Sequence, residues 1–181
     1  TLSEHFVVEE RAFTQMLQAR NVTAALQPIV RVTDGRLRAF EVLGRGQVEG
    51  LPNSPMGLLG LAMRLGKEVE LSEAFRWAGL TTAASLAPEA TLFVNAHPKE
   101  MFQEAFYRSI ALLRAMVPTA SLVVEVHESA VTQIADVRAM ADRLSGYGVQ
   151  FAYDDFGAGQ ARLLELAEVP PHFVKFDMGL I

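Results

Sequence analysis

Four polar side chains interrupt apolar stretches of this sequence where a β-strand is expected. Glu41, Asn95, Glu125 and Asp154 each lie within or at the end of a hydrophobic run. Acidic residues and Asn are poor strand formers, and an unpaired carboxylate is costly to bury. Four such interruptions indicate one shared site.

Further charged residues extend the pattern. Glu128 comes three residues after Glu125, Asp155 follows Asp154, and Lys175 lies in the last apolar run. Five carboxylates gathered in one place repel one another unless cations neutralise them. Oxygen ligands without cysteine favour hard divalent ions, and this set is large enough for two Mg²⁺ or Mn²⁺ ions.

Two divalent ions held side by side point to phosphodiester hydrolysis. Such a pair activates a water molecule and stabilises the leaving oxygen of a displacement at phosphate. Lys175 is then suited to orient the water or to neutralise developing charge. Arg45, four residues after Glu41, is suited to hold a phosphate oxygen in bidentate fashion.

Each of these residues also has a plainer interpretation when taken alone. Glu41 can form a structural ion pair with Arg45, and Asn95 can cap the end of a strand. The aspartates at 154 and 155 can form a simple turn. The histidines at 97 and 127 have no second His four residues later, so capping or solvated roles are expected of them.

The elements that must position these residues alternate along the chain. Strands are predicted over 91–95, 122–126, 150–154 and 172–176, with helices over 103–116, 132–144 and 161–168 between them. This alternation predicts a parallel sheet, in a doubly wound sheet or a (β/α) barrel. The carboxyl ends of its strands then meet at one rim, where barrel enzymes bind their ligands.

The first half of the chain has a different order. A helix is predicted over 3–20, followed by antiparallel strands over 25–31 and 37–45 that are joined by a turn at 33–35. Helical periodicity then covers 54–86, with a break at Gly66. Met56 and Met63 fall within this part, and we expect them to fill the core.

Composition limits the number of domains, the possible ligands and the location of the chain. The 181 residues suit one domain, and 16 basic against 21 acidic residues leave no basic block for DNA or RNA. The absence of Cys excludes disulfides and thiolate metal sites, which makes the cytoplasm the default expectation. No apolar stretch reaches the roughly 20 residues of a spanning helix. Because the chain begins at Thr1 and ends in an apolar run, we expect it to be part of a longer protein.

The strings that hold the polar residues have a recognisable order. They read LQPIV at 26–30, EVLGR at 41–45, FVN at 93–95 with Pro98, VEVHES at 124–129, YDDFGAG at 153–159 and VKFD at 174–177. From about Leu26 to Ile181 the chain therefore resembles the EAL family of cyclic di-GMP phosphodiesterases. The resemblance implies a TIM-like (β/α) barrel with an antiparallel first strand. An N-terminal helix over 1–22 and the first six strands over 23–181 would form one EAL-type domain.

The resemblance also assigns roles to individual residues. Glu41, Asn95, Glu125 and Asp154 would ligate one metal ion, and Asp155 would help to hold the second. The catalytic set would be Glu41, Asp154, Glu128 and Lys175, with Lys175 on the catalytic water. Gln27, Leu43 and Arg45 would face the dinucleotide.

The chain departs from the family pattern at several positions. Val42 stands for the usual Ala, and His127 for the usual Thr. Residues 160–162 read QAR instead of Tyr-Ser-Ser, after a loop from Phe156 that couples dimerisation to metal binding in the family. The family's further catalytic Glu and substrate-binding Gln lie on later strands. The barrel is therefore expected to be incomplete at its C-terminus, and the 181-residue chain to be inactive alone.

Two functions follow from the resemblance. The first is metal-dependent hydrolysis of cyclic di-GMP to linear pGpG. The alternative is an inactive domain that binds cyclic di-GMP or a protein partner as a sensor. The expected partners are cyclic di-GMP, a second copy of the chain in a homodimer, and a regulatory or GGDEF-type domain ahead of residue 1.

Overall fold

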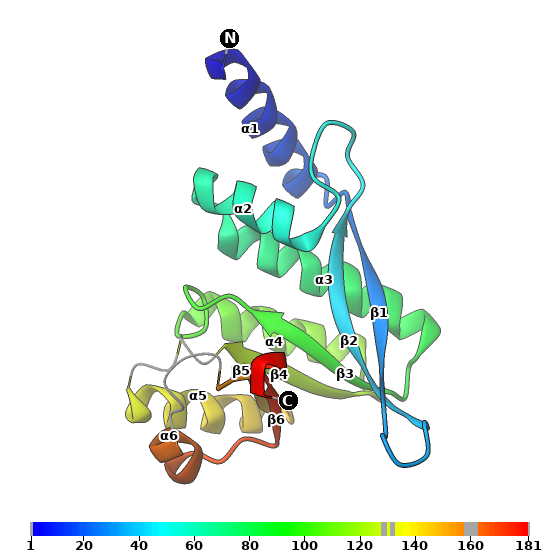
Figure 1. Cartoon of the computed structure of the whole chain (residues 1–181), viewed down its shortest axis with the longest axis vertical. Coiled ribbons are helices and arrows are strands. Elements are labelled where there is room, and N and C mark those ends of the chain that lie inside the picture. The colour runs from blue at the N-terminus through cyan, green and yellow to red at the C-terminus, as the bar shows by residue number, and fades with distance from the viewer. Residues whose placement is uncertain (1, 128–129, 131–132, 158–162, 181) are drawn as a thin grey trace.

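Six strands form one sheet, side by side in chain order (Figure 1). The computed structural model describes residues 2–127, 130, 133–157 and 163–180. The strands are β1 (Val22–Val30), β2 (Leu37–Gly46), β3 (Thr91–Ala96), β4 (Ser121–His127), β5 (Gln150–Phe156) and β6 (Phe173–Phe176). In the described part of the chain β1 and β6 are the two edges, so the sheet is open.

The first two strands form the predicted antiparallel hairpin, and every later pair is parallel. Asp34 closes the hairpin turn by accepting hydrogen bonds from the Arg31 side chain and the Arg36 backbone amide. Gly35 supplies the positive φ of 66° that this turn requires. The fold class expected from the sequence, a six-stranded part of a TIM-like barrel with an antiparallel first strand, is confirmed.

The helices follow the predicted order, with small shifts at their ends. They are α1 (Leu2–Gln18), α2 (Pro55–Leu65), α3 (Glu68–Leu86), α4 (Glu104–Met116), α5 (Ile134–Gly146) and α6 (Leu163–Glu168), with a short 3-10 helix η2 (Met178–Leu180) after β6. Gly66 ends α2 in the left-handed conformation, as its break in the pattern predicted. Among the described residues no helix is both long and apolar enough to span a membrane.

Helices α3, α4 and α5 cover the outer face of the sheet and bury its largest apolar cluster (Figure 1). Helix α3 lies very close to β2, because glycine occupies the contact on both sides. A Cβ atom at Gly79 would lie 1.9 Å from Val42 Cγ1, and one at Gly44 would lie 2.0 Å from Phe75 Cγ. A second apolar cluster joins α1, α2 and the start of α3 through Phe13, Leu58 and Leu71 among others.

Candidate active site

The inner face of the sheet carries two successive layers of side chains. The lower layer is apolar, and Ala39, Phe93, Val123 and Ala152 form it. Phe173 joins this layer by an edge contact with Phe93, with ring centroids 5.0 Å apart. Alternate residues of a strand point to the same face, so the residues two positions further along lie directly above this layer.

The residues of the upper layer are the polar ones that the sequence singled out. They are Glu41 on β2, Asn95 on β3, Glu125 on β4, Asp154 on β5 and Lys175 on β6. The parallel register places Asn95 beside Glu125. Strand alternation in a parallel sheet thus brings all five to the carboxyl rim, where a barrel binds its ligand.

Lys175 lies at the centre of three carboxylates of this layer. Its Nζ is 2.7 Å from Glu125 Oε1, 3.1 Å from Glu41 Oε2 and 3.3 Å from Asp154 Oδ1. Burial of the ammonium group lowers its pKa, but the attraction of Glu125, Asp154 and Glu41 outweighs burial, and the pKa of Lys175 is raised overall. The ammonium group therefore stays protonated at neutral pH.

Glu125 is the most enclosed of the three acids, with 1% of its surface exposed. Burial raises the pKa of its carboxyl group to about 7, against the opposing attraction of Lys175. Neither carboxylate oxygen has a hydrogen bond of good geometry within the described residues, although Lys175 is at ion-pair distance. A buried carboxylate whose oxygens lack hydrogen bonds is a suitable ligand for a cation.

A cavity of about 710 Å³ opens above the upper layer. Glu41, Asn95 and Asp154 line it together with Leu43, one of the predicted substrate-binding residues. Its volume is in the range of small-molecule sites. Glu41, Asn95 and Asp154 of the predicted rim thus border this cavity.

The two other predicted substrate-binding residues lie at the margin. Gln27 is directly opposite Glu41 in the antiparallel register, so both side chains are on the same face of the sheet, and Gln27 is exposed. Arg45 turns back on its own strand, where Nη1 donates to the carbonyl oxygens of Leu43 and Gly44 at 3.3 and 2.9 Å. Arg45 lines a separate hollow with residues 46–51 and 53.

Asp155 has an unusual backbone conformation and a partly exposed side chain. Its backbone has a φ of 52°, at an irregularity in the pairing of β5 with β6, and half of its side chain is exposed. Its Oδ2 lies 3.4 Å from His127 Nε2. Glu128 and residues 158–162, which include the QAR departure, lie outside the described residues.

Sequence reasoning missed the outer wall of the cavity. Pro55, Met56, Leu59 and Met63 from α2 line it, and Met56 and Met63 are 77% and 67% exposed. The expectation that these two methionines fill the core is therefore wrong. Helical spacing identifies the apolar face of α2, but the position of α2 beside the rim depends on tertiary packing.

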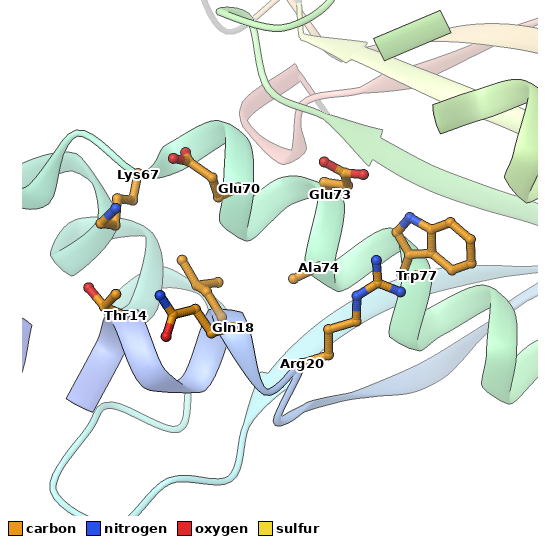
Figure 2. Close-up of a pocket in the computed structure, with 9 residues that line it drawn as sticks. Thr14, Gln18, Arg20, Lys67, Glu70, Glu73, Ala74 and Trp77 are labelled. Carbon is orange, nitrogen blue, oxygen red and sulfur yellow. The ribbon is translucent and has the colours of Figure 1, made fainter. Parts of the chain in front are cut away.

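A smaller hollow of about 300 Å³ lies between the end of α1 and the first half of α3 (Figure 2). Arg20 and Lys67 oppose Glu70 and Glu73 in its lining, and the Arg20 guanidinium lies 4.9 Å from the centre of the Trp77 ring. The mixture of charges selects no ligand class. No residue described as lining this hollow also lines the larger cavity.

The ligand chemistry of the rim fits hard divalent ions. The upper layer offers carboxylate and amide oxygens, which Mg²⁺ and Mn²⁺ prefer, and both Glu125 oxygens are buried without a hydrogen bond among the described residues. Within the described residues no three acids or histidines are already arranged as a ligand set. Lys175 lies between the carboxylates instead, so the ligand assignments remain a prediction.

Comparison with known sequences agrees with this geometry. The EAL domain family matches residues 10–181. MucR of Pseudomonas aeruginosa, a bifunctional diguanylate cyclase/cyclic di-GMP phosphodiesterase, is 31% identical over 177 residues, which are 92% of this chain and 26% of that protein. The chain spans about a quarter of the length of the curated relatives it matches.

Solved structures show the same fold. The FimX EAL domain of Xanthomonas citri, in complex with c-di-GMP, has a TM-score of 0.82 at 18% identity and covers 98% of this chain and 72% of its own. BlrP1 of Klebsiella pneumoniae was solved with c-di-GMP and calcium or manganese. The calcium complex has a TM-score of 0.73 at 25% identity, covering 88% of this chain and 41% of that one, and the manganese complex 0.70 at 23% with the same coverage. With the family match over almost the whole length, these findings show that the chain belongs to the EAL domain family.

Proposed function

We propose that this chain is the phosphodiesterase domain of an enzyme that hydrolyses cyclic di-GMP to linear pGpG with two divalent cations, Mg²⁺ or Mn²⁺. The main support is the convergence of Glu41, Glu125 and Asp154 within 3.3 Å of Lys175 at the rim of a large cavity. The name of MucR and the c-di-GMP complexes of FimX and BlrP1 support the substrate.

In this proposal the upper layer holds the cations. Glu41, Asn95, Glu125 and Asp154 would bind one ion, and Asp155 would help to bind the second. Bound ions would lower the pKa of a water molecule and neutralise charge on the phosphate. The calcium and manganese complexes of BlrP1 support divalent cations as the class.

Lys175 acts as a donor and not as a base. The surrounding acids raise its pKa in the metal-free structure, and a protonated ammonium has no free lone pair to accept a proton. It can donate hydrogen bonds to the attacking water. Glu128 completes the proposed catalytic set.

The substrate would occupy the cavity with its bases against the apolar wall. Leu43 and the α2 methionines offer that wall, and Gln27 lies beside Glu41 at the margin. Arg45 reaches a phosphate only after its guanidinium leaves the Gly44 carbonyl oxygen, which the charge of a phosphate favours.

A second candidate is a domain that binds cyclic di-GMP without cleaving it. The position of Lys175 between the acids, with no preformed set of three ligands in the described part, favours this candidate. Calorimetric binding of cyclic di-GMP and chromatography of the reaction products, both on the full-length protein with Mn²⁺, distinguish the two. Formation of pGpG supports the enzyme, and tight binding without product supports the sensor.

The proposal extends to the location and the assembly of the whole protein. We propose a cytoplasmic location, a homodimer, and a GGDEF-type or other regulatory domain ahead of this segment. The bifunctional name of MucR supports an accompanying diguanylate cyclase domain. Light scattering of the full-length protein tests the dimer, because a monomer at all concentrations would contradict it.

A further inference from the structure

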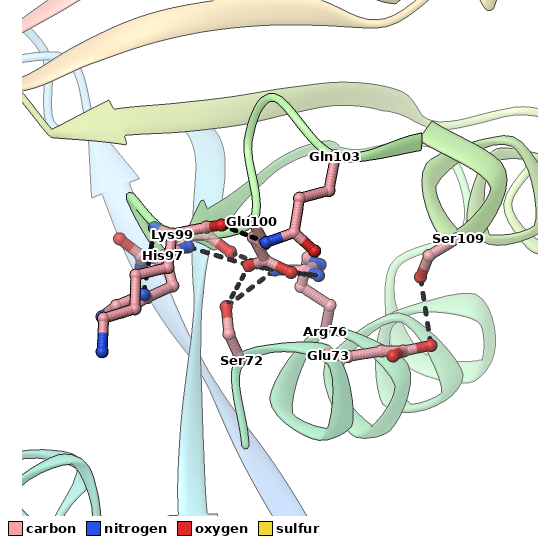
Figure 3. Close-up of polar contacts among 9 residues, drawn as sticks. Ser72, Glu73, Arg76, His97, Lys99, Glu100, Gln103 and Ser109 are labelled. Carbon is pink, nitrogen blue, oxygen red and sulfur yellow. Dashed lines mark hydrogen bonds and ion pairs between the residues drawn. The ribbon is translucent and has the colours of Figure 1, made fainter. Parts of the chain in front are cut away.

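A buried ion pair lies directly behind the end of β3 (Figure 3). Arg76 on α3 and Glu100, four residues after β3, are each 2% exposed. Their contact is bidentate, with Nη1 2.6 Å from Oε1 and Nη2 2.7 Å from Oε2. Ser72 donates a further hydrogen bond of 2.6 Å to Oε1.

Both partners also bind the backbone on either side of residue 96. Arg76 Nη1 donates to the carbonyl oxygen of Asn95 at 3.1 Å. Glu100 Oε1 accepts from the backbone amide of His97 at 2.8 Å. The ion pair thus fixes the chain immediately before and after Ala96, where β3 ends and Asn95 meets the cavity.

The stability of the fold is a poor explanation for such a pair. Well-packed apolar residues in place of a buried ion pair are often neutral or stabilising, because two charges no longer lose their hydration. Arg76 Nε also has no hydrogen-bond partner among the described residues, so the cluster is not fully satisfied. A geometric role at Asn95 accounts for the two backbone contacts.

We propose that Arg76 and Glu100 are positioning residues that hold Asn95 in the orientation needed to bind a divalent cation. Arg76 also borders the cavity, but in this role both side chains act on the ion through Asn95. The inference rests on the proposed function, because it requires Asn95 to be a metal ligand. Removing groups that orient a ligand typically lowers metal affinity by about 10- to 100-fold.

The test is calorimetric titration of the full-length protein with Mn²⁺ alone. The main variant combines Arg76→Met and Glu100→Leu with Ser72→Ala, so that no charge or hydroxyl is left unpaired. Its affinity for Mn²⁺ is expected to fall about tenfold or more while the fold is retained. If it does not fold, Arg76→Lys serves instead, since an ammonium lacks the planar fork that matches both carboxylate oxygens, and a measurable loss of affinity is expected.

A swapped pair separates positioning from simple attraction. Arg76→Glu with Glu100→Arg keeps opposite charges, but position 76 then has no donor for the Asn95 carbonyl and position 100 no acceptor for the His97 amide. It is expected to bind Mn²⁺ as weakly as the apolar variant. Full affinity in the swapped protein would overturn the inference.

The control is Arg143→Met with Glu104→Leu, which removes a bidentate pair of exposed residues between α4 and α5. Its Mn²⁺ affinity should equal that of the wild type. Asn95→Ala identifies the source of any failure. If Asn95→Ala weakens binding but the apolar variant does not, the positioning role is wrong while the proposed function stands. If Asn95→Ala and Glu41→Ala both bind Mn²⁺ normally, the metal site itself is wrong.

Discussion

Lys175 Nζ lies 2.7 Å from Oε1 of Glu125, a carboxylate that is buried from solvent. This lysine neutralises the acids of the rim by direct contact, at the place where the proposed function puts cations. The same carboxylates can be balanced by an ammonium or by divalent ions.

The pH dependence of the free energy of unfolding should reveal the raised pKa of Glu125 in the metal-free protein. Burial raises its folded pKa to about 7, above the ordinary value of 4.5, so the folded state binds the proton more tightly. The associated stability is fully present below pH 4.5 and is lost as the pH rises through 7. Between these limits the wild type should lose about 3 kcal/mol relative to Glu125→Gln.

Urea denaturation in EDTA from pH 4.5 to 8.5 measures this difference. Glu104→Gln is the control. A hydrogen bond from Arg143 lowers the pKa of Glu104 from its ordinary value of 4.5, so its contribution is fully present and constant over this pH range and is lost only at lower pH. A constant difference between wild type and Glu125→Gln over the whole range would contradict the buried, perturbed carboxyl group.

Lys175→Met should separate catalysis from metal binding. Loss of the donor is expected to lower turnover of cyclic di-GMP by about 100-fold or more, in the range found for removing one positioned hydrogen-bond donor. Affinity for Mn²⁺ should be retained or increased, because an ammonium beside the acids competes with cations. Kinetics and Mn²⁺ titration of this variant and of Lys67→Met, as control, test this. Loss of Mn²⁺ binding would show that Lys175 is needed to build the site.

Gly79 tests the close packing of α3 on β2, and Gly60, which is also helical but uncrowded, is its control. Gly79→Ala places a Cβ atom 1.9 Å from Val42 Cγ1 and should destabilise the fold by roughly 1–3 kcal/mol. Gly60→Ala on α2 meets no atom within 4 Å and should stabilise by about 0.5–1 kcal/mol. Thermal melts of both variants decide this, and equal effects would contradict the close contact.

Much of the site could be predicted from the sequence, because strand alternation alone places its residues. Glu41, Asn95, Glu125, Asp154 and Lys175 stand out as polar residues in apolar strands, and parallel strands bring their carboxyl ends to one rim. In the structure Glu41, Glu125 and Asp154 lie within 3.3 Å of Lys175 Nζ, whereas the roles of these residues stay predictions.

Other features depend on contacts that no local pattern contains. The exposure of Met56 and Met63 follows from where α2 lies against the rim. The pairing of Arg76 with Glu100 joins residues 24 positions apart on two elements. The turn of Arg45 toward the Gly44 carbonyl is a choice among side-chain conformations, which sequence spacing does not determine.

Glu41→Ala should abolish turnover while nucleotide binding falls much less. Glu41 contributes to the rim, whereas in the proposed function Leu43 and the apolar wall would hold the dinucleotide independently of it. Calorimetry with cyclic di-GMP, beside a turnover assay, measures both effects. If binding is lost as completely as turnover, Glu41 has a structural role.

The most direct test of the account is the rate of pGpG formation from cyclic di-GMP by the full-length protein, measured with Mg²⁺ or Mn²⁺, after EDTA, and after the metal is restored. We expect turnover with either ion, none in EDTA, and recovery on readdition. Ca²⁺ should inhibit, because it prefers longer bonds and higher coordination than the displacement requires. Undiminished turnover in EDTA would contradict the metal-dependent mechanism.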